Sequence, residues 1–200
     1  MNSFIFEHPP TLQNDRIQLV PMQEKHAIDL FKISDKAIWK FMLQQMETLK
    51  DMQTWVKQAI QMRKEHHALP FAVIHKENQH IIGATRLYEF NFIQKSCELG
   101  ATWYQKNYQR TFVNTDCKLL LLQYCFETLG MIRVQLKTDE RNLPSQKAIE
   151  RLGAKKEGLL RNERILENGY IRNAYIYSII QSEWSQVKEN LLRKVNEYKS

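Results

Sequence analysis

The sequence predicts an α+β fold in which helices cover the faces of a mixed β-sheet. Three strand patterns follow one another closely between residues 71 and 104, as in an antiparallel run. A helix pattern at residues 115–129 then leads into a strand at residues 133–138, which makes a β-α-β unit with a right-handed connection. Two further strands flank Asn168-Gly169 and would complete the sheet as a hairpin.

The first half of the chain contains a short strand, a helical segment and three longer strands. Residues 16–20 alternate between polar and apolar side chains before Pro21, as strands do. From residue 24 to residue 67, apolar side chains recur at steps of three and four, which indicates two or three short helices. The strands that follow are Phe71–His75, Ile81–Asn91 and Ser96–Tyr104.

The second half alternates between helices and strands. Apolar side chains cover nearly the whole circumference of residues 115–129, and Gly130 ends this helix, which should be largely buried. Residues 133–138 alternate strictly and predict a strand. Asn142 begins the next helix, and Gly153 follows its end.

The chain closes with a hairpin and a helix. Asn168 and Gly169 predict a type I′ turn between two strands. Residues 182–200 form an amphipathic helical extension that either packs on its own domain or forms a dimer contact, so monomer and homodimer both stay open. The apolar stripe of this extension consists of Trp184, Val187, Leu191, Val195 and Tyr198.

Length, composition and charge fit one globular domain over residues 1–200. Hydrophobic residues make up 43% of the chain and charged residues 26%. The 29 Lys and Arg against 22 Asp and Glu give a net charge of +7, which favours anionic ligands. The basic residues are interleaved with acids, so we expect no nucleic-acid partner. The N-terminus lacks a signal-peptide pattern, and no apolar run reaches the ~18–20 residues that span a bilayer. We therefore expect a cytoplasmic protein without a membrane partner.

The cysteines and histidines give no sign of a metal centre. Cys97, Cys117 and Cys125 form no Cys-x-x-Cys pair, and we expect them to be buried free thiols. The six histidines lack the spacing of metal ligands, so no metal is expected. The absence of a Gly-x-Ser-x-Gly elbow and of a Gly-Lys-Ser/Thr loop leaves hydrolase and P-loop functions without support.

Three segments of the sequence occur together and in a fixed order, which is a stronger sign of a protein family than any one of them alone. They are ELGATW (98–103), FETLGMIRVQLKTDERNLPSQKAIERLGAKKEGLLRN (126–162) and NGYIRNAYIYSIIQSEW (168–184). Together they resemble the GNAT superfamily of acyl-CoA N-acyltransferases, and most of all its branch of ribosomal-protein N-terminal-alanine acetyltransferases. The resemblance is specific from Glu98 to Trp184, and weaker but compatible from Thr11 to Phe92.

The resemblance implies a six- or seven-stranded, mostly antiparallel sheet that splays open between residues 97–103 and residues 133–138. Acetyl-CoA would enter this gap. Its pantetheine arm would pair with Leu99, Gly100 and Ala101, where a backbone N–H group would polarise the thioester carbonyl. Its pyrophosphate would rest on the loop of residues 108–115.

This pyrophosphate loop departs from the family pattern Arg/Gln-x-x-Gly-x-Gly/Ala. Gln109 matches the first position, but Phe112 and Asn114 replace the glycine and the small residue, and Arg110 replaces another frequent glycine. In one interpretation Phe112 blocks the coenzyme, and Asp116 repels its phosphates. In the other, the Arg110 side chain adds charge-assisted contacts, and backbone N–H groups still hold the pyrophosphate. These N–H groups belong to Arg110, Thr111, Phe112, Val113, Asn114 and Thr115. Asn114 and Thr115 are suitable N-cap residues in either case.

The resemblance also implies the catalytic candidates. Ser145 would stabilise or protonate the coenzyme thiolate, unless its hydroxyl only makes a local backbone bond. Asn142 would bind the pantetheine arm or serve as a plain N-cap. Glu98 is the best placed carboxylate for a general base and Glu89 the second, with a water chain as the alternative to both.

The function that these features predict is transfer of an acetyl group from acetyl-CoA to a primary amine, by direct attack of the amine on the thioester. The amine would belong to a peptide N-terminus or to a small molecule. The alternative is a non-catalytic acyl-CoA-binding or protein-interaction module, which the altered loop would explain. No motif in residues 24–67 identifies the acceptor.

Overall fold

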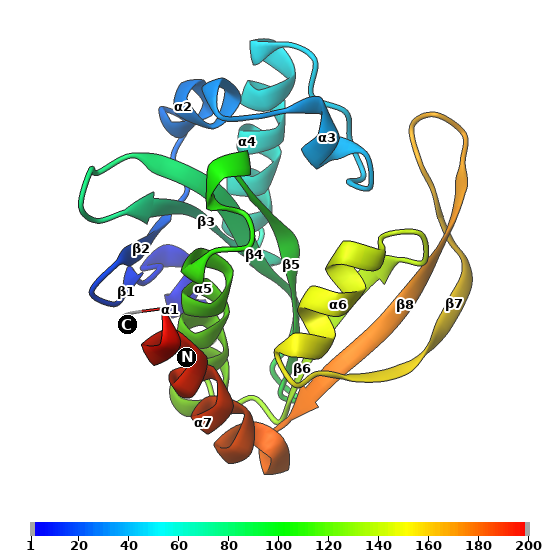
Figure 1. Ribbon diagram of the computed structural model, residues 1–200. Coiled ribbons are helices and arrows are strands. Elements are labelled where there is room, and N and C mark those ends of the chain that lie inside the picture. Colours follow the sequence, from blue (N-terminus) through cyan, green and yellow to red (C-terminus); the bar gives the residue numbers. More distant parts are fainter. Residues whose placement is uncertain (1–2, 199–200) are drawn as a thin grey trace.

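The computed structural model describes residues 3–198, which form an eight-stranded sheet with helices on both faces (Figure 1). The strand order is β1-β2-β3-β4-β5-β6-β8-β7. The strands are β1 (Leu12–Gln13), β2 (Ile17–Pro21), β3 (Ala68–His75), β4 (Ile81–Asn91), β5 (Ser96–Tyr104), β6 (Arg133–Asp139), β7 (Lys155–Ile165) and β8 (Ile171–Ile180). The α-helices are α1 (Phe4–Glu7), α2 (His26–Lys32), α3 (Lys36–Trp39), α4 (Leu49–Lys64), α5 (Phe112–Gln123), α6 (Leu143–Arg151) and α7 (Gln181–Glu197).

The sheet is antiparallel except between β5 and β6, and it opens there. These two strands pair in parallel only at Ser96–Glu98 with Arg133–Gln135. Beyond these pairs the strands diverge, so the predicted splay in a mixed, mostly antiparallel sheet is confirmed (Figure 1). The two-residue strand β1, which the sequence did not indicate, brings the count to eight within residues 3–198.

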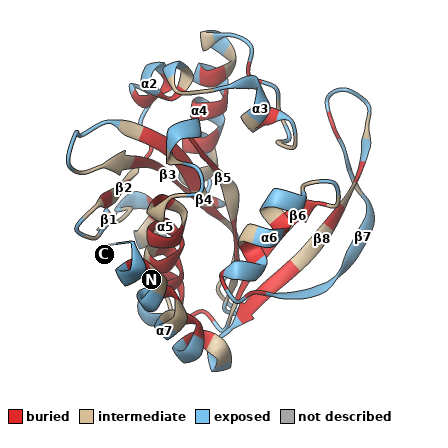
Figure 2. Cartoon of the chain, viewed as in Figure 1, coloured by how far each residue is buried: buried red, intermediate tan, exposed pale blue. Residues whose placement is uncertain are grey.

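Two hydrophobic cores lie on opposite faces of the sheet. One joins α2, α3 and α4 to Ala84 of β4 and Trp103 of β5. The other contains α5 and α7 and most of the apolar residues of the strands. Figure 2 shows that α5 is buried along most of its length, as the sequence predicts, whereas β7 at the edge is exposed.

Helix α5 begins earlier than the sequence indicates. Its N-cap is Thr111, whose extended backbone lets the hydroxyl accept a hydrogen bond from Val113 N at 3.4 Å. The expectation that Asn114 or Thr115 caps the helix is therefore wrong. The last turn before Gly130 widens into a π-helix over Tyr124–Thr128.

The hairpin turn also differs from the predicted type I′ turn. Such a turn needs positive φ at both central residues, but only Gly169 has one, at +78°. Gly169 N donates to Leu166 O at 2.9 Å, and Leu166 N donates to Tyr170 O at 2.9 Å. The connection is thus a type I turn followed by a glycine in the left-handed conformation. This loop has one residue more than the two-residue loop of a type I′ hairpin.

Helix α7 packs against α5 through Trp184, Val187, Leu191 and Val195, which are all buried. Tyr198, which the predicted stripe includes, is 43% exposed, and residues 199–200 of the extension lie outside the described residues. The three cysteines are buried free thiols, as expected. A search of the described residues finds no helix with the length and apolar character needed to cross a membrane.

Candidate active site

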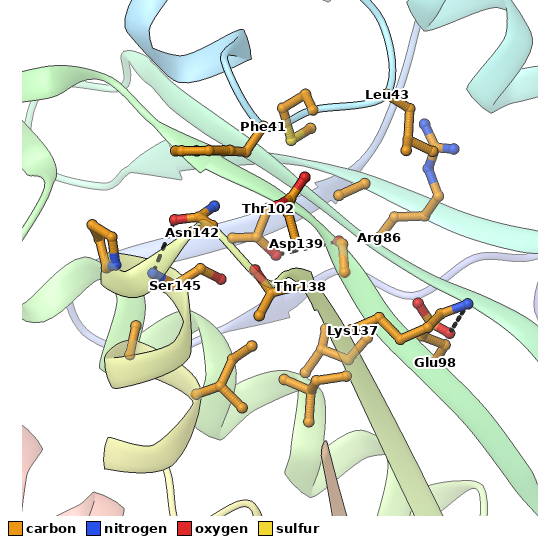
Figure 3. Close-up of a pocket in the computed structure, with 18 of the residues that line it drawn as sticks. Phe41, Leu43, Arg86, Glu98, Thr102, Lys137, Thr138, Asp139, Asn142 and Ser145 are labelled. Atoms are coloured by element: carbon orange, nitrogen blue, oxygen red, sulfur yellow. Dashed lines mark hydrogen bonds and ion pairs between the residues drawn. The ribbon is translucent and has the colours of Figure 1, made fainter. Parts of the chain in front are cut away.

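A cavity of about 1210 Å³ lies where β5 and β6 separate. Its walls come from β4, β5 and β6, from α4, α6 and the first two turns of α5, from the segment after α3 and from the β7–β8 hairpin. Figure 3 shows part of this lining. It is larger than the roughly 300–1,000 Å³ of common small-ligand sites, so it has room for more than one compact ligand.

One wall of the cavity is the bulged part of β5. The register with β4 shifts between Ala84 and Arg86, and Ala101 adopts a positive φ of 46°. Because β5 pairs with β6 only as far as Glu98, its backbone groups beyond that residue are free to pair with a ligand on that side. A Cβ atom on Gly100 would lie 2.6 Å from Tyr88 Oη, so any other residue there would displace the Tyr88 side chain. The predicted residues Leu99, Gly100 and Ala101 all line the cavity.

The loop before α5 turns without glycine. Arg110 itself adopts the left-handed conformation, with a φ of 60°, where the family pattern has a frequent glycine. Gln109 Nε2 donates to Tyr104 O at 3.0 Å and so ties the loop to β5. Of the first N–H groups of α5, that of Val113 donates to Thr111 Oγ1, and the others have no acceptor within the helix, which leaves them for an anion. Gln109, Arg110 and Asn114 line the cavity.

The side chain of Phe112 lies away from this cavity. Its ring packs under the Arg16 guanidinium, 4.4 Å from the ring centroid, and 6.0 Å from the His75 ring. Among the described residues that line the cavity, Phe112 is absent, as are Thr111, Val113 and Thr115. The geometry therefore gives no support to the interpretation in which Phe112 blocks the coenzyme.

Asp116 also faces away from the cavity. Arg16 Nε and Nη2 donate to the two Asp116 carboxylate oxygens at 2.8 and 2.6 Å, and the Asp116 side chain has no exposed surface. Because Arg16 neutralises this buried carboxylate, the expected repulsion of a phosphate loses its force.

The opposite wall is the start of α6, where the two polar candidates meet. Asn142 is the N-cap, and its Oδ1 accepts a hydrogen bond from Ser145 N at 3.1 Å. This leaves the Asn142 amide N–H groups for a ligand. The Ser145 hydroxyl points into the cavity beside Thr138, and none of the hydrogen bonds found within residues 3–198 uses it (Figure 3).

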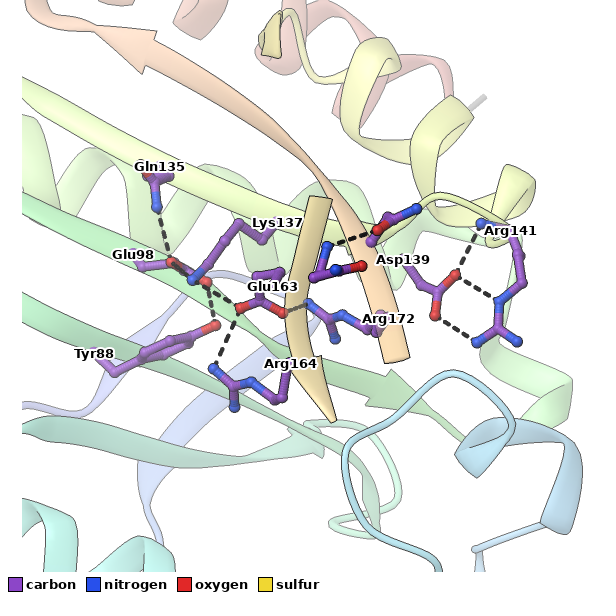
Figure 4. A network of polar contacts seen from close by, with 11 residues as sticks. Tyr88, Glu98, Gln135, Lys137, Asp139, Arg141, Glu163, Arg164 and Arg172 are labelled. Atoms are coloured by element: carbon purple, nitrogen blue, oxygen red, sulfur yellow. Dashed lines mark hydrogen bonds and ion pairs between the residues drawn. The ribbon is translucent and has the colours of Figure 1, made fainter. Parts of the chain in front are cut away.

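Glu98 sits at the closed end of the splay with three donors around it (Figure 4). Its side chain is buried, at 1% exposure for the residue, and it receives hydrogen bonds from the Tyr88 hydroxyl and from Gln135 Nε2, the latter at 3.0 Å. Lys137 Nζ lies 3.1 Å from Glu98 Oε2. Burial, and then the Glu98 charge, raise the pKa of Tyr88 well above its ordinary value, so the phenol stays protonated. Glu89 lines the same cavity but is exposed.

The hairpin brings further charges that the sequence did not indicate. Glu163 of β7 lies 3.6 Å from Lys137, 3.3 Å from Arg164 and 3.1 Å from Arg172 (Figure 4). A break in the β7–β8 register at Asn162, where φ is 52°, accompanies this inward turn. Strand alternation alone gives no signal for such a bulge.

Lys118 is a second unpredicted group, on the second turn of α5. It is 5% exposed, lines the cavity and donates to Thr102 Oγ1 at 2.7 Å. Burial lowers the pKa of Lys118 to about 8. A sequence signal existed, because a lysine inside an otherwise apolar helix needs a special environment.

Strands β5 and β6 separate beside a helix start with free N–H groups, and this arrangement has the space and the donors for an extended, anionic ligand. The chain belongs to the GNAT acetyltransferase family, since the family model "Acetyltransferase (GNAT) domain" matches residues 16–155. It is an N-acetyltransferase, and the family uses acetyl-CoA.

Similar proteins agree with this assignment. The "Uncharacterized N-acetyltransferase p20" of Bacillus licheniformis is 26% identical over 180 residues, which are 88% of this chain and 98% of that protein. A GCN5-related N-acetyltransferase from Brucella melitensis has the same fold, with a TM-score of 0.86, 24% identity and coverage of 93% of this chain and 85% of that one. The Microcin C7 self immunity acetyltransferase MccE, solved in complex with acetyl-CoA and AMP, gives a TM-score of 0.74 at 24% identity, over 84% and 93% of the two chains.

Proposed function

We propose that the chain is a single-domain enzyme that transfers the acetyl group of acetyl-CoA to the primary amine of a small molecule or a peptide N-terminus. The observation that carries this proposal is the Ser145 hydroxyl. It points into the cavity across from the bulged, unpaired part of β5, without a partner in residues 3–198.

The cavity suits the coenzyme because it offers donors along its length. The N–H groups at the start of α5, together with Arg110, would hold the pyrophosphate. The free edge of β5 and the Asn142 amide would hold the pantetheine arm. The bound coenzyme supplies the reactive thioester.

We assign the proton of the departing thiol to Ser145, whose oxygen takes up a proton from solvent in the same step. A thiolate leaves more readily when a hydroxyl donates to it, and Ser145 has this hydrogen free. Its position is fixed, because its backbone N–H is held by Asn142 at 3.1 Å.

We assign the proton of the attacking amine to Glu98, reached through Tyr88. Three donors already surround the Glu98 carboxylate, but one of them is the Tyr88 hydroxyl. The phenol oxygen can accept a proton from the amine while its own proton passes to Glu98. The raised pKa of Tyr88 keeps the phenol protonated before that step. Replacing Tyr88 by Phe would break this path.

The test is Ser145→Ala, with exposed Ser182→Ala of α7 as its matched control. Thiol release with a panel of amines gives kcat, and calorimetry gives the affinity for acetyl-CoA. We expect Ser145→Ala to lower kcat by about 100-fold or more, as for loss of a general acid, and to leave the affinity within threefold. Equal loss of both, or no binding of millimolar acetyl-CoA by the unmodified protein, would contradict the proposal.

A further inference from the structure

Arg86 of β4 extends into the end of the cavity that faces α4 and the segment after α3. It lies beside the bulge of β4 and β5, and its guanidinium points towards Leu43 (Figure 3). Arg86 Nη1 lies 3.2 Å from Met62 Sδ, and its guanidinium carbon is 5.4 Å from the centroid of the Trp55 ring. These are weak partners for a full positive charge.

The other arginines with side chains turned into this region each have a carboxylate partner. Arg164 and Arg172 share Glu163, and Arg141 pairs with Asp139. No ion pair is found between Arg86 and any carboxylate of residues 3–198. Burial lowers the pKa of Arg86 below its ordinary value, yet a guanidinium stays protonated in proteins, so the charge persists without a counter-ion.

Arg86 is half-buried, and a partly desolvated cation without an anion is costly. A ligand that places an anion against this guanidinium removes that cost and binds more tightly. The planar guanidinium matches the two oxygens of a carboxylate or a phosphate. The coenzyme phosphates have their own place at the start of α5, whereas the contacts of Arg86 come from α4. The unpaired charge therefore faces the second ligand of the cavity, the acceptor.

The walls around Arg86 add a second requirement. Trp39, Phe41, Met42 and Trp55 line this end of the cavity and give it an apolar surface. A ligand that fills it would carry an apolar part beside its anionic group.

We propose that Arg86 binds a carboxylate or phosphate group of the acceptor, so that the substrate is an amine that also carries an anion and an apolar portion. This inference rests on the proposed acetyl transfer to an amine.

The experiment measures binding separately from turnover. Calorimetry on protein saturated with coenzyme A uses two matched ligand pairs. Phenylalanine against phenylalaninamide tests a carboxylate, and tyramine O-phosphate against tyramine tests a phosphate. The variants are Arg86→Gln and Arg86→Lys, with exposed Arg161→Gln of β7 as control. Thiol release from acetyl-CoA is followed with the same ligands.

We expect one anionic ligand to bind at least 10-fold more tightly than its neutral partner, which is what a charge-assisted hydrogen bond provides. Arg86→Gln should remove this preference, Arg86→Lys should keep part of it, and Arg161→Gln should keep all of it. The pair that shows the preference identifies the anion.

Four results would overturn the inference: equal binding within both pairs, no binding of any of these ligands, a preference that survives Arg86→Gln, or a loss of coenzyme affinity in that variant. An Arg86-dependent preference without thiol release would instead support the anion site and count against the proposed transfer reaction.

Discussion

Removing one partner of the ion pair between Arg16 and Asp116 should destabilise the protein more than most single substitutions do. The Asp116 side chain has no exposed surface, and its carboxylate receives two hydrogen bonds from Arg16, at 2.8 and 2.6 Å. The guanidinium also covers the Phe112 ring at the first position of α5. Arg16→Met removes the charge and keeps the length of the side chain.

The variant leaves a buried carboxylate without a partner, which costs about 3–5 kcal/mol of unfolding free energy. With a urea slope of about 2 kcal/mol per M, the unfolding midpoint should fall by about 2 M. Urea titrations followed by circular dichroism measure this shift, and exposed Arg161→Met serves as the control, with an expected change within about 0.5 kcal/mol.

The double variant Arg16→Met with Asp116→Leu separates this explanation from general damage. Because a buried pair replaced by apolar residues of similar size is often neutral, the double variant should regain most of the lost stability. The reasoning would be refuted if Arg16→Met cost less than about 1 kcal/mol, or if the double variant were less stable than the single one.

Three further predictions test other parts of the site. Phe112→Leu should leave the acetyl-CoA affinity within threefold by calorimetry, because the ring lies outside the cavity; a tenfold change would place it at the coenzyme. Lys118 has a folded pKa of about 8 against 10.5 for the free side chain, so the unfolded chain binds more protons between these values and its contribution to stability rises with pH across that window. Lys118→Met should abolish this part of the rise in unfolding free energy, which urea titrations between pH 8 and 10 measure. If the unfolding free energy rises as steeply with pH in the variant, the lowered pKa of Lys118 is not its cause. Gly169→Ala should lower the unfolding free energy by about 1 kcal/mol, because a Cβ atom disfavours a φ of +78°; a neutral result in the same titrations would be inconsistent with this turn geometry.

Local pattern predicted the strands more accurately than the helix ends. The bounds of β4 and β5 agree with the alternation of residues 81–91 and 96–104, since each strand has a long run of suitable side chains. The start of α5 was placed late, because Thr111, Asn114 and Thr115 are all capable N-caps and only the folded loop selects one. The hairpin was found from Asn168-Gly169, but its turn type was not, since the number of loop residues depends on where the strands stop pairing.

The candidate site shows the same division. The resemblance to the GNAT superfamily implied that Gln109, Asn142 and Ser145 lie around one site, and all three line the cavity. It did not show the bulges at Ala101 and Asn162, which depend on how neighbouring strands twist. Arg86 lies beside the first of these bulges, whereas Lys118 reaches the cavity from α5.

At the glycine-free loop before α5, what the sequence determines can be separated most clearly from what only the tertiary structure decides. The sequence by itself determined that a loop leads from a strand into a buried helix here, because periodicity is a local property. Only the tertiary structure decided that Phe112 and Asp116 turn away from the cavity. Their partner, Arg16, lies about a hundred residues earlier in the chain, and only the pairing of distant strands brings it to the helix start.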